Sequence, residues 1–278
     1  MAPKTQKIIA LLLSSLILIA LCTELAIFSI NLRTRHRAEA LLSSIRHLRI
    51  GESRSEVQRL LSEYDPTAAG FLRTEPRLEG LFAVPSLPAP RTTAGQPAEG
   101  ANFDAQAEQT YFIYVFPQTV NRIGSSSRVF WAIGAAPWAV EVRLEFEADK
   151  LNSLTYSLGF GAASLGPPKE LVAVARLRRN SGISENPSAR IRYDMHPSSI
   201  MPNASGQFRL GAVIAPDATE EQRNSAFDFD LSCLSTVHGC RAICEVIPKV
   251  WKEAVERSGK KEIILPMNEL DDSVCHGA

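Results

Sequence analysis

The sequence lacks an excess of charge of either sign. Thirty lysine and arginine residues balance thirty aspartate and glutamate residues over a chain of 278 residues. A protein that attracts nucleic acid through its overall electrostatic field needs a surplus of basic residues. The composition therefore predicts no nucleic-acid partner.

The sequence also lacks the short motifs that identify common catalytic and cofactor-binding sites. The glycine-rich segment 159–166 matches neither the phosphate-binding order G-x-x-x-x-G-K-[ST] nor the nucleophile motif G-x-S-x-G, so we interpret it as a turn. His196 and His238 have no carboxylate at ligand or triad spacing in the sequence. We therefore predict no cofactor, and no catalytic residue can be assigned.

Long apolar runs are absent except for one, from Ile8 to Ile30, which contains a single formal charge, Glu24. At about 1.5 Å per helical residue, the run is long enough to cross a hydrocarbon core of roughly 30 Å. We predict a short tail (1–7) and a transmembrane anchor (8–30) in the lipid bilayer. A cleaved secretory signal is the alternative, because residues 8–22 alone have the length of a signal-peptide core.

Cysteines are few and clustered. Cys22 lies in the apolar run, and the other four fall in the last 46 residues. An even number of clustered cysteines in a chain with an export-like segment favours disulfides, and we expect the pairs Cys233–Cys240 and Cys244–Cys275. Free thiols remain an alternative. A metal site is less favoured, because the spacing lacks the paired C-x2-C pattern of zinc sites.

The orientation of the anchor is indicated by two opposing signals. Lys4 and Lys7 precede the run and Arg33, Arg35, Arg37, Arg46 and Arg49 follow it, so the positive-inside rule keeps the large domain in the cytoplasm. Large domains can nevertheless be exported, and a short lysine-bearing tail is typical of a signal anchor. With the expected disulfides, we predict a single-pass membrane protein whose large domain is exported to the periplasm or the extracellular space.

The stretch 31–65 has the clearest helical pattern, which predicts a juxtamembrane helix pair. Gly51 is placed to end the first helix, and Ser53 and Glu56 form a capping-box pattern that begins the second. The expected core positions are Leu41, Leu42, Ile45 and Leu48 in the first helix and Val57, Leu60, Leu61 and Tyr64 in the second.

A pattern of glycine, a small polar residue, Glu-Val and Leu-Leu runs through residues 48–61, about 14 of the 278 residues. It consists of Leu48, Ile50, Gly51, Ser53, Glu56, Val57, Leu60 and Leu61. This pattern resembles the helical start of the small outer-membrane assembly lipoproteins, the SmpA/OmlA-like family, although the family's lipid-acceptor cysteine motif is missing. The resemblance implies an envelope context, a helix pair packed on a sheet and no enzymatic activity.

The rest of the chain divides into a proline-rich loop (66–107) and an α+β domain (108–278) that packs with residues 38–65. Alternating apolar residues predict a mostly antiparallel sheet, followed by C-terminal helices. The expected strands are Tyr111–Phe116, Val129–Ile133, Val140–Phe146, Leu151–Leu158, Leu171–Leu177, Ala189–Met195, Gln207–Ile214 and Ala226–Leu231. Pro248 is expected to kink one helix or to begin the next, which ends near Gly259.

These features favour a membrane-anchored, non-catalytic interaction or scaffolding module with an envelope protein as its partner. Two other functions stay open. One is a membrane-bound hydrolase whose site forms from residues scattered over the sheet. The other is a cytoplasmic domain that binds anionic lipid, since seven arginines stand against three glutamates between residues 33 and 59.

Overall fold

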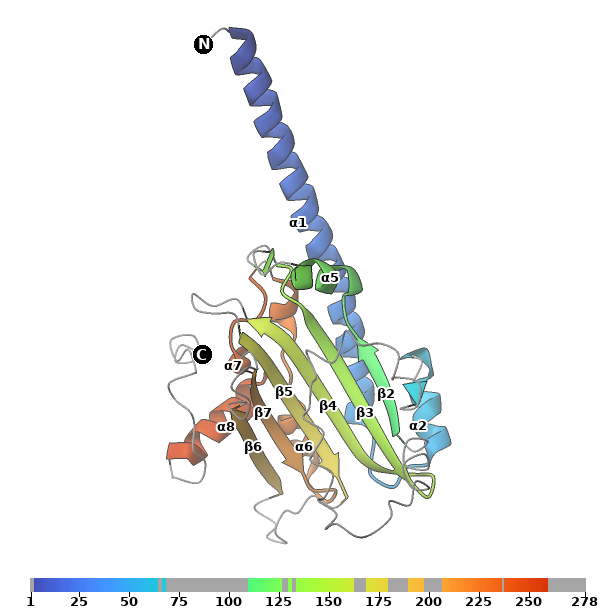
Figure 1. Cartoon of the computed structure of the whole chain (residues 1–278). Helices are drawn as coiled ribbons and strands as arrows, with labels where there is room; N and C mark the ends of the chain where they lie inside the picture. Colours follow the sequence, from blue (N-terminus) through green and yellow to red (C-terminus); the bar gives the residue numbers. More distant parts are fainter. Residues whose placement is uncertain are drawn as a thin grey trace, which may run out of the picture.

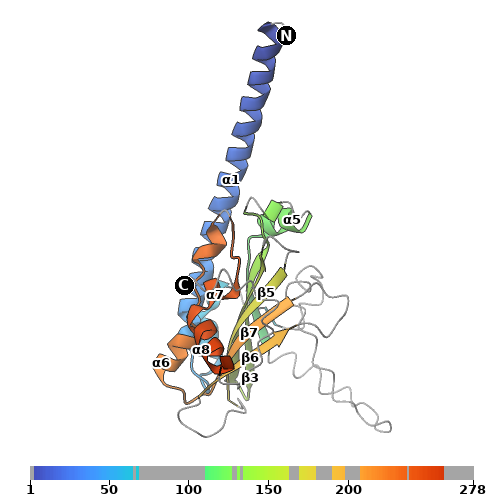
Figure 2. The same cartoon turned by 90° about the vertical axis from the view of Figure 1, so that its left-hand side faces the viewer.

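The computed structural model describes residues 3–64, 67–68, 110–126, 130–131, 134–162, 169–179, 190–197, 207–236 and 238–259. They form the expected α+β fold, in which one long helix, α1 (Pro3–Arg46), extends beyond the domain at its amino-terminal end (Figure 1). Helices α1, α6, α7 and α8 lie on one face of the sheet (Figure 2). The hydrophobic core fills the space between this helical layer and the sheet.

The seven described strands are β1 (Thr67–Ala68), β2 (Thr110–Val115), β3 (Trp138–Glu147), β4 (Lys150–Ala162), β5 (Lys169–Arg178), β6 (Ile191–Pro197) and β7 (Gln207–Ile214). Their order in the sheet is β1-β2-β3-β4-β5-β7-β6. Neighbouring strands among them are antiparallel except β5 and β7, which run parallel. The sheet is therefore mixed but mostly antiparallel, as the alternating pattern predicted.

Short helical elements complete the described fold. They are α2 (Arg54–Leu60), η1 (Ser62–Tyr64), α5 (Gln118–Ser126), α6 (Glu220–Ala226), η4 (Ser232–Ser235), α7 (Ile243–Val246) and α8 (Pro248–Gly259). Pro248 begins α8, where its missing N–H costs no helical hydrogen bond.

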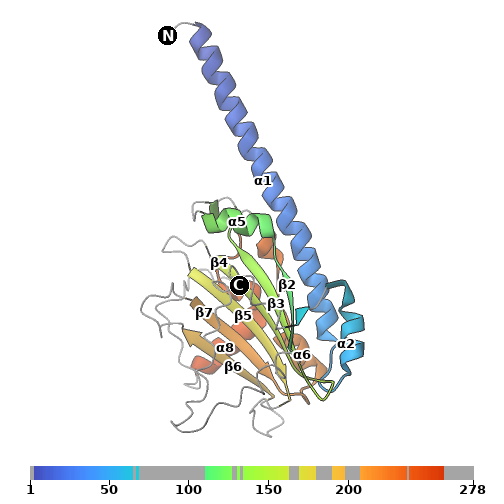
Figure 3. The same ribbon diagram turned by 45° about the vertical axis from the view of Figure 1, so that its right-hand side comes forward.

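Helix α1 is exposed along its first half and partly buried along its second. Leu16 and Leu25 are 62% and 64% exposed, whereas Ile27 is only 4% exposed. From Ile27 onward one stripe of α1 is buried: Ile27, Asn31, Ala38, Leu41, Leu42 and Ile45. Figure 3 shows the same helix passing α5 and continuing along the domain toward α2.

The exposed half of α1 is long and apolar enough to cross a membrane. Its freely exposed part, residues 8–26, is about 28 Å long at 1.5 Å per residue. The last turn of the predicted anchor instead packs on the domain, and the helix continues without a break at residue 31, where a separate element was expected to begin. α1 ends at Arg46, earlier than expected, and Gly51 serves the turn into α2 with a φ of +95°.

Strands β3 and β4 form an antiparallel hairpin from two strands that the alternating sequence pattern predicted. Its two-residue turn, Ala148 and Asp149, has positive φ angles of 49° and 58°, the backbone twist that suits tight hairpins. The start of α2 holds this turn, because the Arg54 N–H donates to the Asp149 carbonyl oxygen at 2.8 Å and its guanidinium pairs with the Asp149 carboxylate at 3.1 Å. As predicted, Ser53 caps α2 by accepting a hydrogen bond from the Glu56 N–H.

Two predicted strands are wrong where they can be examined. Phe130 and Trp131, the described residues of the expected strand 129–133, lie in a helical turn. Trp131 is buried there, and its indole N–H donates to the Gly124 carbonyl oxygen at 3.0 Å. The expected strand 226–231 is also absent, because Ala226 ends α6 and the following residues form no strand.

The alternation that suggested the second strand does reflect burial, although the backbone is irregular. Its buried residues are Phe227, Phe229 and Leu231. Asp228 pairs with Lys249 at 3.1 Å, and Asp230 accepts a hydrogen bond from the Ser232 N–H at 2.8 Å. Asp228 thus joins this segment to α8, whereas the exposed Asp230 makes only a local contact at the start of η4.

The expected glycine-rich turn at 159–166 is also wrong in its described part, because Gly159 and Gly161 lie within β4. A Cβ atom on Gly161 would lie 2.7 Å from the Trp131 ring. Glycine is needed at this position for the close approach of an indole, and not for a turn. Most of the proline-rich segment 66–107 lies outside the described residues, apart from the short strand β1.

The two leucines at the end of α2 differ in burial, which corrects the expectation that both face the core. Leu60 is 43% exposed and Leu61 is fully buried. We predict that Leu61→Ala lowers the free energy of unfolding by about 2–5 kcal/mol, the cost of a core cavity, whereas Leu60→Ala lowers it by less than about 1 kcal/mol. Denaturant unfolding of the two variants checks this, and equal losses would contradict the packing described here.

Candidate functional site

The contacts that join α1 to the domain include hydrogen bonds at several points along the helix, and we call these contacts the α1 junction. They occur at three heights along the helix. The uppermost contacts begin with an apolar cluster. In it, Ile27 and Ile30 of α1 pack against Val120 and Ile123 of α5 and against Ala135. Helix α5 therefore lies beside the end of the apolar segment (Figure 1).

Asn31 forms the uppermost polar contact of the α1 junction. Its side chain is 2% exposed, and its Oδ1 accepts a hydrogen bond from the Trp138 indole N–H at 3.1 Å. Its Nδ2 donates to the Gly134 carbonyl oxygen, also at 3.1 Å. Because both polar atoms of a buried amide are paired, Asn31 fixes the rotation of α1 against β3 without an unsatisfied group.

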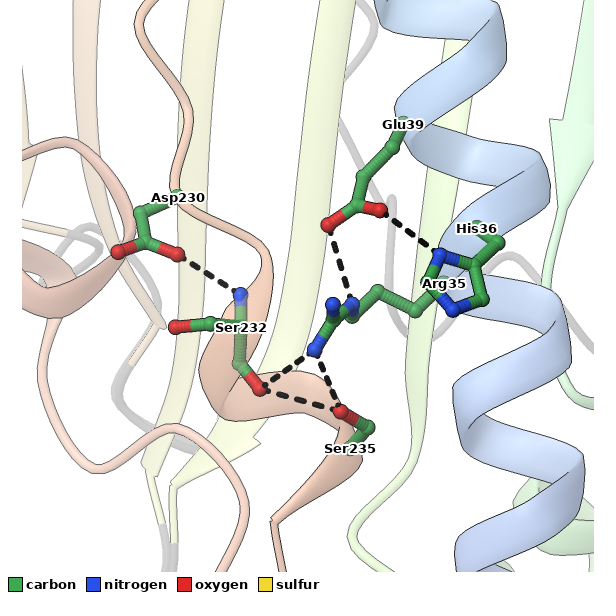
Figure 4. Close-up of polar contacts among 6 residues, drawn as sticks. All are labelled: Arg35, His36, Glu39, Asp230, Ser232 and Ser235. Carbon is green, nitrogen blue, oxygen red and sulfur yellow. Dashed lines mark hydrogen bonds and ion pairs between the residues drawn. The ribbon is translucent and has the colours of Figure 1, made fainter.

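Arg35, one turn further along α1, forms the middle contact (Figure 4). Its Nη1 donates to the Ser235 hydroxyl at 2.8 Å and approaches the Ser232 carbonyl oxygen at 3.4 Å, both in η4. Glu39 orients the guanidinium, with its Oε1 at 3.0 Å from Arg35 Nε. Asp230 in turn accepts from the Ser232 N–H and so supports η4 from the other side.

The lowest contacts lie where α1 ends. Arg46 donates from Nε to the Phe227 carbonyl oxygen at 3.1 Å. Arg223 of α6 donates in the reverse direction, to the carbonyl oxygens of Arg46 at 3.3 Å and of Leu48. Since the last carbonyl groups of a helix have no partner within the helix, Arg223 satisfies acceptors that would otherwise be buried unpaired. Burial, followed by the charge of Arg49, lowers the pKa of Arg223.

The predicted disulfide residues lie beside the middle contact. A disulfide joins Cys233 in η4 to Cys240, with their Cα atoms 4.8 Å apart. Cys244, at the start of α7, is buried and also disulfide-bonded. Its expected partner, Cys275, lies outside the described residues, so the pair Cys244–Cys275 stays a prediction. Cys22 is a free, exposed cysteine on the apolar half of α1.

The α1 junction is an arrangement for holding a helix, because the hydrogen bonds described for its side chains run to one another or to backbone atoms. No cluster of histidine, cysteine and acidic side chains among the described residues could hold a metal ion. His238 is exposed in the turn within the Cys233–Cys240 loop, and His196 lies in β6.

On the sheet, burial raises the pKa of Glu141, while a hydrogen bond from Tyr114 and the charges of Arg143 and Arg209 oppose the rise.

Sequence reasoning missed the α1 junction, since Arg35 was counted only as a charge that flanks the anchor and no role was predicted for Asn31. One signal was present: these residues continue the helical stripe that ends in Ala38, Leu41 and Ile45. Comparison with protein-family models, curated proteins and solved structures reveals no match to the chain. The geometry is therefore the basis of the functional argument.

Replacement of Asn31 tests the uppermost polar contact. We predict that Asn31→Leu destabilises the domain by about 1–3 kcal/mol, because the Trp138 indole N–H and the Gly134 carbonyl oxygen lose their buried partner. The control is Ser29→Ala on the same helix, whose exposed hydroxyl bonds only its own helix and whose loss should cost under about 0.5 kcal/mol. Thermal unfolding of the full chain in detergent, followed by tryptophan fluorescence, measures both. A stability equal to that of the control would contradict the contact.

Removal of the Cys233–Cys240 bridge tests the support of η4. The bridge closes a short loop, with a sequence separation of 7, so we predict that the double variant Cys233→Ser, Cys240→Ser loses about 2–3 kcal/mol. Amide hydrogen exchange should rise first in η4 and in the α1 turn around Arg35, which η4 holds. Cys22→Ser is the matched control and should change neither quantity. Unaltered exchange in the double variant would show that η4 needs no crosslink.

Proposed function

We propose that the chain is a single-pass membrane protein and that its exported α+β domain is a non-catalytic interaction or scaffolding module of the cell envelope. The observation that carries the proposal is the continuity of α1. One helix provides a lipid-length apolar segment and then a buried stripe of the domain core. Such a helix holds the domain at a fixed height and rotation above the bilayer.

The exposed half of α1 supports anchoring. The 18-residue window of highest hydropathy has no buried residue, so its apolar side chains lack a partner among the described residues. Exposed apolar surface of this extent is costly in water and favourable in lipid. The burial of Ile27 and the partial burial of Ile30 support a position of α5, and of the exposed ring of Phe130 after it, near the lipid headgroups.

Two observations support export. Disulfides persist in oxidising compartments, and Cys233 and Cys240 are bridged. In addition, three of the arginines that argued for a cytoplasmic domain have partners within the fold. Arg35 pairs with Glu39, Arg37 lies 5.9 Å from the Tyr64 ring, and Arg46 binds the Phe227 carbonyl oxygen. Folding thus explains their presence without a role in orientation. The proposal includes an envelope protein as the partner. It rests here on the resemblance of residues 48–61 to the SmpA/OmlA-like lipoproteins, which implies an envelope context.

The anchor is tested by membrane fractionation. We expect the full chain to remain with membranes after carbonate extraction, because the predominantly apolar segment 8–26 would be buried in lipid. Leu16→Arg should prevent or weaken insertion, since a central arginine costs on the order of 3 kcal/mol. Leu16→Ile keeps the apolar surface and should behave as the wild type. A soluble product that begins between residues 20 and 42 would instead identify a cleaved signal.

The orientation is tested by reporters fused after Ala278. An exported domain should give an active alkaline phosphatase fusion and a dark green-fluorescent-protein fusion. Alkylation of native membranes under non-reducing denaturation should leave Cys233 and Cys240 protected. The reverse reporter pattern, together with freely alkylated thiols, would move the domain to the cytoplasm and leave the anchor itself unaffected.

A further inference from the structure

A polar cavity of about 380 Å³ lies where α1 ends, between its last turn, α6 and the first turn of α8. Five basic side chains line it: Arg46, His47, Arg49, Arg223 and Lys249. The volume is within the range of small-molecule sites. None of these residues was expected to form a site, because they come from three separate parts of the chain.

Positive charge exceeds negative charge around the cavity. Three arginines and Lys249 stand against two lining carboxylates, Glu220 and Asp228, and against Glu52 nearby, whose charge acts on Arg49 and Arg223, which leaves a surplus of one charge without counting His47. Asp228 is already engaged, since its carboxylate lies 3.1 Å from Lys249 Nζ and 4.0 Å from Arg46 Nη2. Among the described residues, no ion pair joins Asp228 to Arg49 or Arg223, which lie nearer to Glu52 and, for Arg223, Glu220.

Arg223 is the buried member of this group. It is 3% exposed, and its Nη2 is bound to the carbonyl oxygens at the end of α1. Its Nε is also buried and forms no hydrogen bond within the described part of the chain. The charges of Glu52 and Glu220 offset only part of the penalty, and the neighbouring Arg49 adds repulsion. A buried charge that is only partly offset is costly, and the charge of an anion in the cavity reduces this cost by Coulomb attraction without a direct hydrogen bond to Nε.

We propose that this cavity is a binding site for a phosphate group. Guanidinium groups present planar, paired donors that match the oxygen atoms of a phosphate, and the negative charge of a phosphate balances the surplus positive charge. Arg223 provides buried positive charge at the wall of the cavity, and Arg49 and Lys249 provide donors from the exposed side. The site does not depend on the proposed scaffolding role.

The position of the cavity bears on the source of the phosphate. It lies at the far end of the docked half of α1, about 24 Å beyond residue 30 at 1.5 Å per residue. Figure 1 shows this end of α1 on the opposite side of the domain from α5. The geometry therefore favours a free phosphate or a soluble phosphate ester over a headgroup of the bilayer that holds the anchor.

The test uses the full chain in nanodiscs of phosphatidylcholine, titrated with inorganic phosphate against chloride at constant ionic strength. We expect phosphate to raise the unfolding temperature saturably. Arg49→Gln should weaken phosphate binding by about tenfold or more, because it removes a charge-assisted contact. Arg59→Gln is the matched control, an exposed arginine of α2 that does not line the cavity, and it should bind as the wild type does.

A second arm replaces phosphatidylcholine with phosphatidylglycerol and omits phosphate. A stabilisation that Arg49→Gln abolishes in this arm would assign the phosphate to a lipid headgroup, whereas a response confined to the first arm assigns it to a soluble ligand. The proposal is overturned if neither arm gives a response that depends on Arg49. Lys249→Gln provides a second exposed variant, so the outcome does not depend on replacing the structural Arg223.

Discussion

The fold depends on one unbroken helix, α1, whose first half is exposed and apolar and whose second half packs on the domain. Between Ile8 and Arg46 the sequence contains neither proline nor glycine, the residues at which helices usually kink. The hydrogen bonding of α1 therefore continues from the exposed apolar half into the half that packs on the sheet. Any tilt or rotation of the apolar half must be shared by the domain, because the helix has no hinge between them.

The contacts along α1 have complementary roles. Apolar packing of Ala38, Leu41 and Ile45 supplies most of the buried surface but does little to fix the rotation of the helix. Hydrogen bonds are directional, so Asn31 near one end and the reciprocal bonds of Arg46 and Arg223 at the other determine rotation and position. Buried polar groups of this kind specify one arrangement among several that would bury similar area.

Elements with a regular pattern were predictable from the sequence, and elements defined by distant contacts were not. The β3–β4 hairpin and α8 were recognised because alternation and Pro248 are local signals. Helices α5 and α6 were missed because they are short and largely polar, although Thr219 and Gln222 form a capping box that could have revealed α6. The α1 junction and the basic cavity could not be found locally. Arg46 and Phe227 are 181 positions apart, and nothing near either residue in the chain indicates the other.

This separation also affects how the protein is made. Helix α1 is synthesised first, and the residues that hold it come much later in the chain. The hydrogen bonds to Trp138, Phe227 and Ser235 span 107, 181 and 200 positions. The apolar stripe of α1 therefore stays exposed until most of the domain has been translated. Contacts of such long range slow folding and prolong the exposure of apolar surface. If the apolar half enters the bilayer early, it tethers the waiting stripe near the emerging sheet and reduces the volume that the two must search.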